Sequence, residues 1–129
     1  MKIVLDTNVL ISSLLNPNGN PAKILNLILS LKIILLFDNR IINEYYNVLK
    51  REKFQFSDDL ILPLMDFIKH EGIYINAEPI KKKFTDEDDK KFYEVFISSS
   101  ADYLVTGNIN HFPKEKLIVK PVVFINQFL

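Results

Sequence analysis

The sequence contains no cysteine, and this absence excludes several kinds of chemistry. A chain without cysteine has no disulfide framework, no thiolate zinc site and no cysteine nucleophile. The glycine motifs GxGxxG, GxxxxGKS/T and GxSxG are missing too, so the signals of dinucleotide-binding folds, P-loop proteins and serine hydrolases are not found. The 129 residues suffice for one hydrophobic core, and we predict a single domain over residues 1–129.

Long apolar runs and an excess of charge are also missing. Residues 24–37, the longest apolar region, are interrupted by polar side chains, and the opening MKIVLD is too short for a signal-peptide core. We therefore expect a soluble, cytoplasmic protein with no membrane partner. The 16 basic and 16 acidic side chains balance, which argues against a surface that is positive throughout. Acids gathered at one site, with bases around it, would give the same balance.

Short apolar runs alternate with longer segments that have a helical period. The pattern predicts strands at residues 2–5, 33–37, 72–75, 102–106 and 122–125, and helices at 8–14, 22–30, 40–51, 57–70 and 85–99. Asp38 is placed to cap the helix at 40–51, and Thr85 with Asp88 resembles a capping box. Strands separated by helices indicate an α/β fold with a parallel sheet of four to five strands and right-handed crossovers.

Four acidic residues far apart in the chain fall at positions that this fold brings together. Asp6 follows the first strand, Glu44 lies beside the apolar stripe of its helix, and Asp88 and Asp89 open the last predicted helix. Strand ends and helix starts share one edge of a parallel sheet, so these carboxylates can meet there. Because clustered carboxylates raise one another's pKa, a hard divalent cation such as Mg²⁺ or Mn²⁺ would stabilise them. The arrangement suggests metal-dependent chemistry on phosphate.

Each of these acids also has an ordinary structural explanation. Asp6 could cap the helix that follows it, and Glu44 could pair with a nearby lysine or arginine. Asp86 and Glu87 suit the positive end of a helix dipole. The spacing to the buried phenylalanines of the helix favours Asp89 over Asp88 as a site residue.

The remaining polar candidates are weaker. Asn8 and Ser13 could hydrogen-bond a metal ligand at Asp6 or the water around it. Asp102 precedes its strand at the opposite edge, which indicates a structural role. The two histidines, His70 and His111, have no partner at a zinc-site spacing, and we expect them on the surface.

Three segments resemble one family in the order in which they occur: IVLDTNVLIS, NEYYNVLKREKF and DEDDKKFYEVFISSSADYLVTGN. They are similar to the PIN domain and, more narrowly, to PIN-domain toxins of toxin–antitoxin systems. The resemblance covers essentially the whole chain. It implies a three-layer α/β/α sandwich around a parallel sheet, and a metal-dependent ribonuclease.

The resemblance also assigns roles residue by residue. Asp6 matches the first acid of the family, Glu44 the second, and Asp88 or Asp89 the third. These acids would hold one Mg²⁺ or Mn²⁺, with Asp6, Glu44 and Asp89 as the preferred set. The metal would activate a water for attack on a phosphodiester of single-stranded RNA.

Two further positions qualify that assignment. Thr106 matches the threonine after the fourth strand, and Asn108 stands where many members carry a fourth acid. Thr106 and Asn108 would orient water or the scissile phosphate, while the amide at 108 would leave a second metal weakly bound.

Partners follow from the same resemblance and from composition. A homodimer is favoured, and the aromatic side chains Tyr45, Tyr46, Phe54 and Phe56 would suit an interface, although they could equally complete the core. A cognate antitoxin protein would be encoded elsewhere.

Two other functions stay open. Asn108 is compatible with a PIN-like module that binds RNA or protein and has little catalytic activity. A phosphohydrolase of the haloacid dehalogenase type also carries an aspartate after its first strand, but it needs a second aspartate two residues on, where this chain has Asn8.

Overall fold

The computed structural model describes residues 1–128; Leu129, the last residue of the predicted domain, lies outside the described residues. The strands are β1 (Lys2–Leu5), β2 (Ile34–Phe37), β3 (Ile73–Tyr74), β4 (Tyr103–Val105) and β5 (Ile118–Val119). The α-helices are α1 (Thr7–Leu15), α2 (Asn20–Leu29), α3 (Asn39–Leu49), α4 (Asp58–Glu71), α5 (Lys90–Ser99) and α6 (Pro121–Phe128). Three short 3₁₀ turns, η1 (Glu52–Phe54), η2 (Glu87–Asp89) and η3 (Ile109–His111), complete the order.

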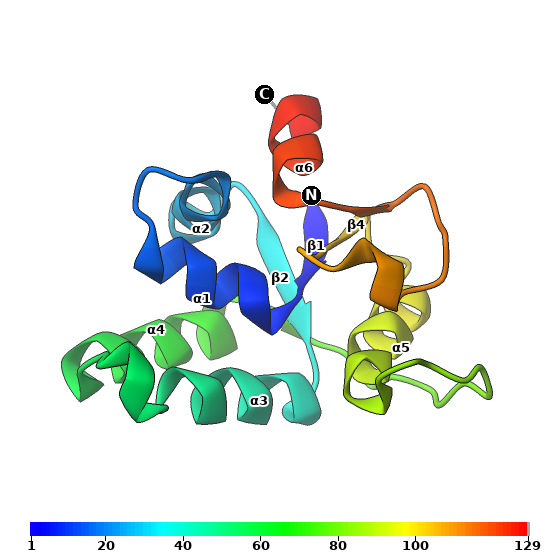
Figure 1. The fold of residues 1–129 in the computed structure, drawn as a ribbon, viewed down its shortest axis with the longest axis horizontal. Helices are drawn as coiled ribbons and strands as arrows, with labels where there is room; N and C mark the ends of the chain where they lie inside the picture. The colour runs from blue at the N-terminus through cyan, green and yellow to red at the C-terminus, as the bar shows by residue number, and fades with distance from the viewer. Residues whose placement is uncertain (129) are drawn as a thin grey trace.

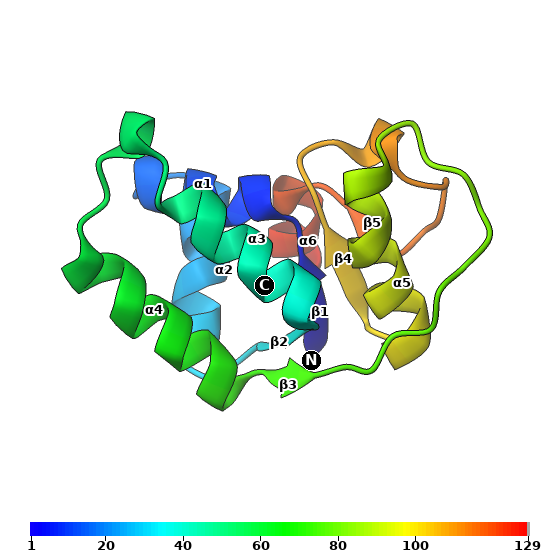
Figure 2. The same cartoon turned by 90° about the horizontal axis from the view of Figure 1, so that it is seen from below.

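The five strands form one parallel sheet in the order β3-β2-β1-β4-β5. Helices α1 to α4 gather on one side of the strands and α5 on the other, where it packs against β1, β2 and β4 (Figure 1, Figure 2). Helix α6 packs against α2. The predicted three-layer α/β/α sandwich with a parallel sheet is confirmed.

Apolar side chains on both faces of the strands make the core. Ile3, Val4 and Leu5 of the central strand are at most 1% exposed, as expected of a parallel strand covered on both faces. Helix α3 buries one stripe, which includes Ile41 and Tyr45, and leaves its opposite face to solvent. The buried strands β1 and β4 thus end at the carboxyl edge of the sheet with the core packed around them.

The predicted strand at residues 122–125 is wrong, since these residues belong to α6. The helix begins at Pro121, which is well suited to a first helical position because it has no N–H to satisfy. Phe124 and Ile125 are buried, whereas Val122 and Val123 are exposed, so the segment buries one helical face. A short apolar run does not distinguish a strand from a helix, and the fifth strand lies a few residues earlier at Ile118–Val119.

The predicted caps have different outcomes. Asp38 caps α3 as expected, with its Oδ1 accepting the N–H of Ile41 at 3.0 Å. The capping box predicted at Thr85 is not formed: Asp86 caps the turn η2, where its Oδ1 accepts the N–H of Asp88 at 3.0 Å, and α5 itself begins after Asp89 without a side-chain cap. The chain makes the 3₁₀ turn η2 there before α5 begins. In residues 1–128 no helix is both long enough and apolar enough to cross a membrane.

Candidate metal-binding active site

Asp6 lies at the carboxyl edge of the sheet, where β1 ends. Its backbone N–H donates to the carbonyl of Val105 at 2.9 Å, which continues the pairing of β1 with β4. Its side chain is buried, and the Thr106 hydroxyl, 0% exposed, donates to Asp6 Oδ2 at 2.7 Å. Neighbouring strands therefore fix both the backbone and the carboxylate of Asp6.

Tyr45 connects α3 to the same edge. Its side chain is fully buried, and its hydroxyl donates to the carbonyl of Leu5 at 2.5 Å. Burial, together with the charges of Asp6 and Glu44, raises the pKa of Tyr45 well above its ordinary value, so the phenol stays a neutral donor. This bond anchors α3 beside the end of β1 and brings Glu44, the preceding residue, to the site.

Glu44 has two partners from other elements. The buried Thr7 hydroxyl donates to Oε2, and the Lys91 ammonium lies 2.7 Å from Oε1. The ion pair considered from the sequence is thus formed, with a lysine of α5. Glu44 remains about a quarter exposed, since its side chain has 26% of its surface open to solvent.

Asp89 reaches the site from the turn before α5. Its side chain is 16% exposed, and its Oδ2 lies 3.2 Å from His111 Nδ1. Burial is the main cause that raises the pKa of Asp89, followed by the charge of Asp86, while His111 acts in the opposite direction. Asp88, the alternative, is exposed. Of the two, Asp89 is the acid whose charge raises the pKa of Asp6.

The three carboxylates influence one another electrostatically. The pKa of Asp6 is raised from 3.8 to about 6, chiefly by burial; the Thr106 hydrogen bond lowers it, and the charges of Asp89 and Glu44 raise it further. In the described part of the chain, no three acidic or histidine side chains already converge as a metal-binding group. Glu44 and Asp89 instead face Lys91 and His111.

The donor set nevertheless suits a hard divalent cation. The three acids offer carboxylate oxygens, the ligands that such a cation prefers. Burial and the charges of Asp89 and Glu44 make the ionised form of Asp6 unfavourable, and a bound cation would stabilise it. Asp6, Glu44 and Asp89 are the residues that could hold Mg²⁺ or Mn²⁺.

The hydroxyl and amide candidates after β4 take specific positions. The Thr106 oxygen accepts the backbone N–H of Asn108 at 3.0 Å while its proton goes to Asp6. Thr106 is completely buried, and its hydroxyl holds the Asp6 carboxylate in place. Asn108 is half-buried beside it.

Other expectations can be compared with the structure directly. The Ser13 hydroxyl donates to the carbonyl of Leu10 at 2.5 Å within α1. Asn8 is exposed at the start of α1. Asp102 lies at the opposite edge of the sheet, where it accepts the backbone N–H of Lys2 at 2.8 Å, in agreement with a structural role.

Sequence reasoning missed three contact residues of the site: Thr7, Lys91 and His111. Thr7 is next to Asp6, so its hydroxyl could have been considered as a donor. Lys91 was only one member of a lysine pair, and His111 was expected to be a surface residue. Neither has a spacing that indicates contact with Glu44 or Asp89.

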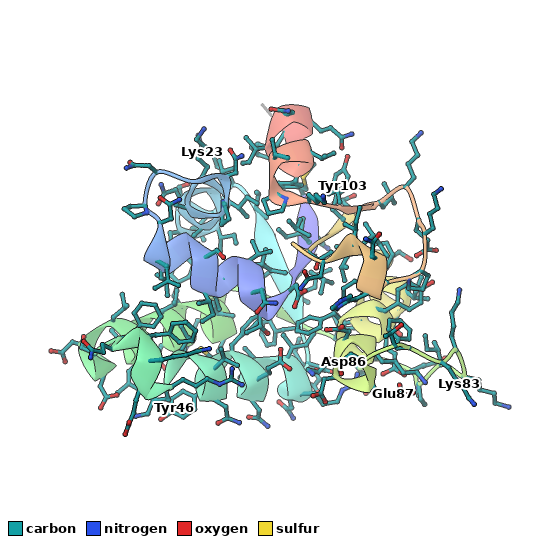
Figure 3. All side chains as sticks on the ribbon, viewed as in Figure 1. Lys23, Tyr46, Lys83, Asp86, Glu87 and Tyr103 are labelled. Atoms are coloured by element: carbon teal, nitrogen blue, oxygen red, sulfur yellow. The ribbon has the colours of Figure 1, made fainter. Side chains whose placement is uncertain are left out.

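Two hollows adjoin the acids. The larger, of about 520 Å³, lies between α3 and α5 next to Glu44, and we call it the α3–α5 groove; its basic and amide side chains are Arg40, Asn43, Asn47, Arg51, Lys90 and Lys91. The smaller hollow, of about 190 Å³, is lined by Lys82, Lys83 and His111 among others. Figure 3 shows Lys83 at the same end of the molecule as Asp86 and Glu87, far from Lys23 on α2.

Comparison with known proteins identifies the family. Residues 2–110 match the model of the PIN domain. The chain belongs to the PIN domain family. PIN domains are in general nucleases that act on nucleic acid, and they typically use divalent metal ions.

This PIN domain also has a curated relative. It is 37% identical over 111 residues to the uncharacterized protein MJ1680 of Methanocaldococcus jannaschii, a match that covers 84% of the chain and 71% of the relative.

Proposed function

We propose that this PIN domain is a metal-dependent endoribonuclease that hydrolyses phosphodiester bonds of single-stranded RNA. The observation that supports this most strongly is the buried Asp6, whose pKa is raised by burial and by Asp89 and Glu44 at one edge of the sheet. Membership of a family of nucleases supports the reaction class. Single-stranded RNA is proposed because an unpaired strand can bend into a narrow acidic site.

Each carboxylate would have a defined task. Asp6, oriented by Thr106, would be the central ligand, and Glu44 and Asp89 would complete the set. Mg²⁺ or Mn²⁺ bound there would lower the pKa of a coordinated water and polarise the phosphoryl oxygen. Asn108 would offer only an amide oxygen where many relatives carry an acid, so we propose one well-bound metal.

Basic side chains beside the acids would hold the flanking phosphates. The α3–α5 groove adjoins Glu44, and the smaller hollow adjoins Asp89 through His111 and contains Lys82 and Lys83. Contacts to phosphate give affinity and position without reading sequence. An RNA strand that crosses the site could use both hollows.

The test is cleavage of a single-stranded RNA oligonucleotide by purified protein with Mn²⁺ and with EDTA. We expect cleavage only with metal, and a loss of at least about a hundredfold in Asp6→Asn, because one ligand oxygen and its charge are removed. Asp66→Asn, an exposed change on α4, controls for net charge. Equal cleavage by Asp6→Asn and the parent protein would refute an enzyme at this site.

A second candidate is a PIN-like module that binds RNA or protein with little catalysis. The amide of Asn108 and the pairing of Glu44 and Asp89 with Lys91 and His111 favour it. Asn108→Asp distinguishes the two: a large gain in Mn²⁺-dependent cleavage from a nearly inactive parent would favour the module. Because the chain belongs to the PIN family, we no longer consider a phosphohydrolase of the haloacid dehalogenase type.

We further propose that the protein is the toxin of a toxin–antitoxin pair, with a cognate antitoxin, and that it forms a homodimer. The PIN family supports these proposals by association. Of the aromatic side chains considered for the interface, Tyr45 is in the core and Phe54 stacks on Phe56 at 5.7 Å, while Tyr46 is 37% exposed. Growth arrest that depends on Asp6 would test the toxin role, and light scattering at micromolar concentration would test the dimer.

A further inference from the structure

Lys91 makes an ion pair that differs from an ordinary surface pair. Its Nζ lies 2.7 Å from Glu44 Oε1 and donates to the backbone carbonyl of Asp88 at 2.5 Å. The Lys91 side chain is only 12% exposed. By contrast, Lys50 and Asp58 form a pair in which both side chains are open to solvent. Lys91 is therefore a partly buried cation held against one of the candidate metal ligands.

The position of Lys91 implies competition with a divalent cation. Glu44 Oε1 faces the ammonium, and Oε2 accepts the Thr7 hydroxyl. A carboxylate that turns to a divalent ion gives up its bond to Lys91, and two cations at one carboxylate repel each other. Lys91 therefore supplies one positive charge to the acidic edge, at the carboxylate where a metal would supply its own.

The α3–α5 groove is where a displaced Lys91 would lie. Four basic and four acidic side chains line it, so its charges balance. Arg40 is held by Asp38 and Glu94 at 2.6 and 2.7 Å, whereas Lys90 is only 4.0 Å from Glu87. If a metal neutralises the charge of Glu44, the net charge of the groove becomes more positive by one. A phosphodiester backbone is the ligand class that such a groove attracts.

We propose that Lys91 is a tethered cation that neutralises Glu44 in the metal-free protein and turns to the RNA backbone in the α3–α5 groove when metal binds. This inference rests on the proposed function and adds a coupling to it, since metal binding at Glu44 makes a phosphate contact available. RNA affinity rises with metal through Lys91 as well as through the metal itself.

The first test measures Mn²⁺ affinity by isothermal titration at pH 8, without RNA. Lys91→Met keeps the length of the side chain and removes the competing charge, so we expect about three- to tenfold tighter Mn²⁺ binding. Lys91→Arg keeps the charge and should bind Mn²⁺ as the parent protein does. Lys90→Met is the matched control, because it removes the neighbouring charge and leaves the Glu44 pair intact, and it should change the affinity less than about twofold.

The second test measures RNA binding by fluorescence anisotropy against salt concentration. Ca²⁺ serves as the metal, with a gel to verify that the oligonucleotide stays intact. With Ca²⁺, Lys91→Met should lower the slope of log K against log salt by about 0.7, the loss of one phosphate contact on a single strand. In EDTA the slopes of the two proteins should agree, because Glu44 then holds Lys91.

The outcomes separate this inference from the proposed function. If Lys91→Met binds Mn²⁺ no more tightly while Asp6→Asn binds it more weakly, the metal site stands and the role of Lys91 is refuted. If Mn²⁺ binding tightens but the salt slope with Ca²⁺ is unchanged, the phosphate contact is refuted. If the parent protein neither binds Mn²⁺ nor cleaves RNA, the proposed function fails and this inference with it. Urea unfolding in EDTA verifies that each variant is folded.

Discussion

At the scale of single residues, Asp6 is the most constrained carboxylate of the site. Its backbone belongs to the β1–β4 pairing, and its Oδ2 accepts the buried Thr106 hydroxyl. Glu44 and Asp89 are more exposed and face Lys91 and His111. Asp6 thus has its position set by the fold, whereas the other two acids have partners that a metal would have to replace.

The raised pKa of Asp6 predicts a pH-dependent stability. The folded-state pKa of about 6 exceeds the ordinary value of 3.8, so the protonated carboxyl favours folding and stability falls as pH rises through that interval. The loss above pH 6 is about 3 kcal/mol. In EDTA, Asp6→Asn should therefore be more stable than the parent protein at pH 8, by up to about 3 kcal/mol, and nearly equal to it near pH 4.

Urea unfolding at the two pH values measures this difference. Asp66→Asn removes an exposed carboxylate of α4 and controls for net charge. A difference between Asp6→Asn and the parent protein that is the same at pH 4 and pH 8 would contradict the explanation.

The variant Thr106→Val should change the pH dependence of cleavage. The hydroxyl bond to Asp6 lowers the pKa of that carboxyl, and valine keeps the shape of the side chain without the donor. The acidic limb of the pH–rate profile should move up by about one pH unit. Rates at pH 8.5 serve as the internal control, because Asp6 is ionised there in both proteins. An unshifted acidic limb would show that Thr106 does not tune Asp6.

At the scale of elements, α5 and the turn before it carry several functions on different faces. Asp89 pairs with His111, Lys91 with Glu44, and Glu94 with Arg40. The helix ends at Ser100, which adopts the left-handed conformation with φ 52° and ψ 44°. The position of the site side chains therefore depends on how well this helix is held at both ends.

Ser100→Gly should stabilise the protein by about 1 kcal/mol. Glycine has no Cβ to oppose a positive φ, and it is the preferred residue at such a helix end. Ser99→Gly, one residue earlier in the helical conformation, should destabilise by about 1 kcal/mol, which makes it the matched control. Thermal unfolding measures both changes, and a lower midpoint for Ser100→Gly would contradict the assignment of the helix end.

At the scale of the whole molecule, one network around the buried Glu94 connects three distant segments. Glu94, 4% exposed, accepts Arg40 at 2.7 Å on Oε1 and the backbone N–H of Ile80 at 2.8 Å on Oε2. Arg40 also pairs with Asp38 at the end of β2. This network holds α5 to α3 and to the segment around Ile80, which precedes α5 in the chain. It thereby maintains the distance across the α3–α5 groove.

Glu94→Gln should lower the free energy of unfolding by about 1–3 kcal/mol. The amide has one acceptor oxygen and no charge, so it cannot satisfy both Arg40 and Ile80. Glu87→Gln, at an exposed position near the same helix, should change the value by less than about 0.5 kcal/mol. Urea unfolding at pH 7 measures both, and equal effects would refute a special role for Glu94.

Much of the fold could be predicted because the decisive signals are local. A short apolar run indicated β1, the stripe that includes Ile41 and Tyr45 indicated α3, and Asp38 was recognised as its cap. Residues 122–125 were placed wrongly because four apolar residues suit a strand or a helix equally, and packing against α2 decided for the helix. The capping box at Thr85 was also placed wrongly, because the chain makes the turn η2, capped by Asp86, before α5 begins.

The sequence by itself determined the composition of the candidate site: an aspartate after the first strand, a glutamate beside a helix core face and an aspartate at a helix start. The fold brings Glu44 and Asp89 close enough for their charges to raise the pKa of Asp6. Only the tertiary structure decided what each acid faces, namely Thr106 for Asp6, Lys91 for Glu44 and His111 for Asp89. These partners come from segments far apart in the chain, so no local spacing records them, and the contacts exist only once the strands and α5 have packed.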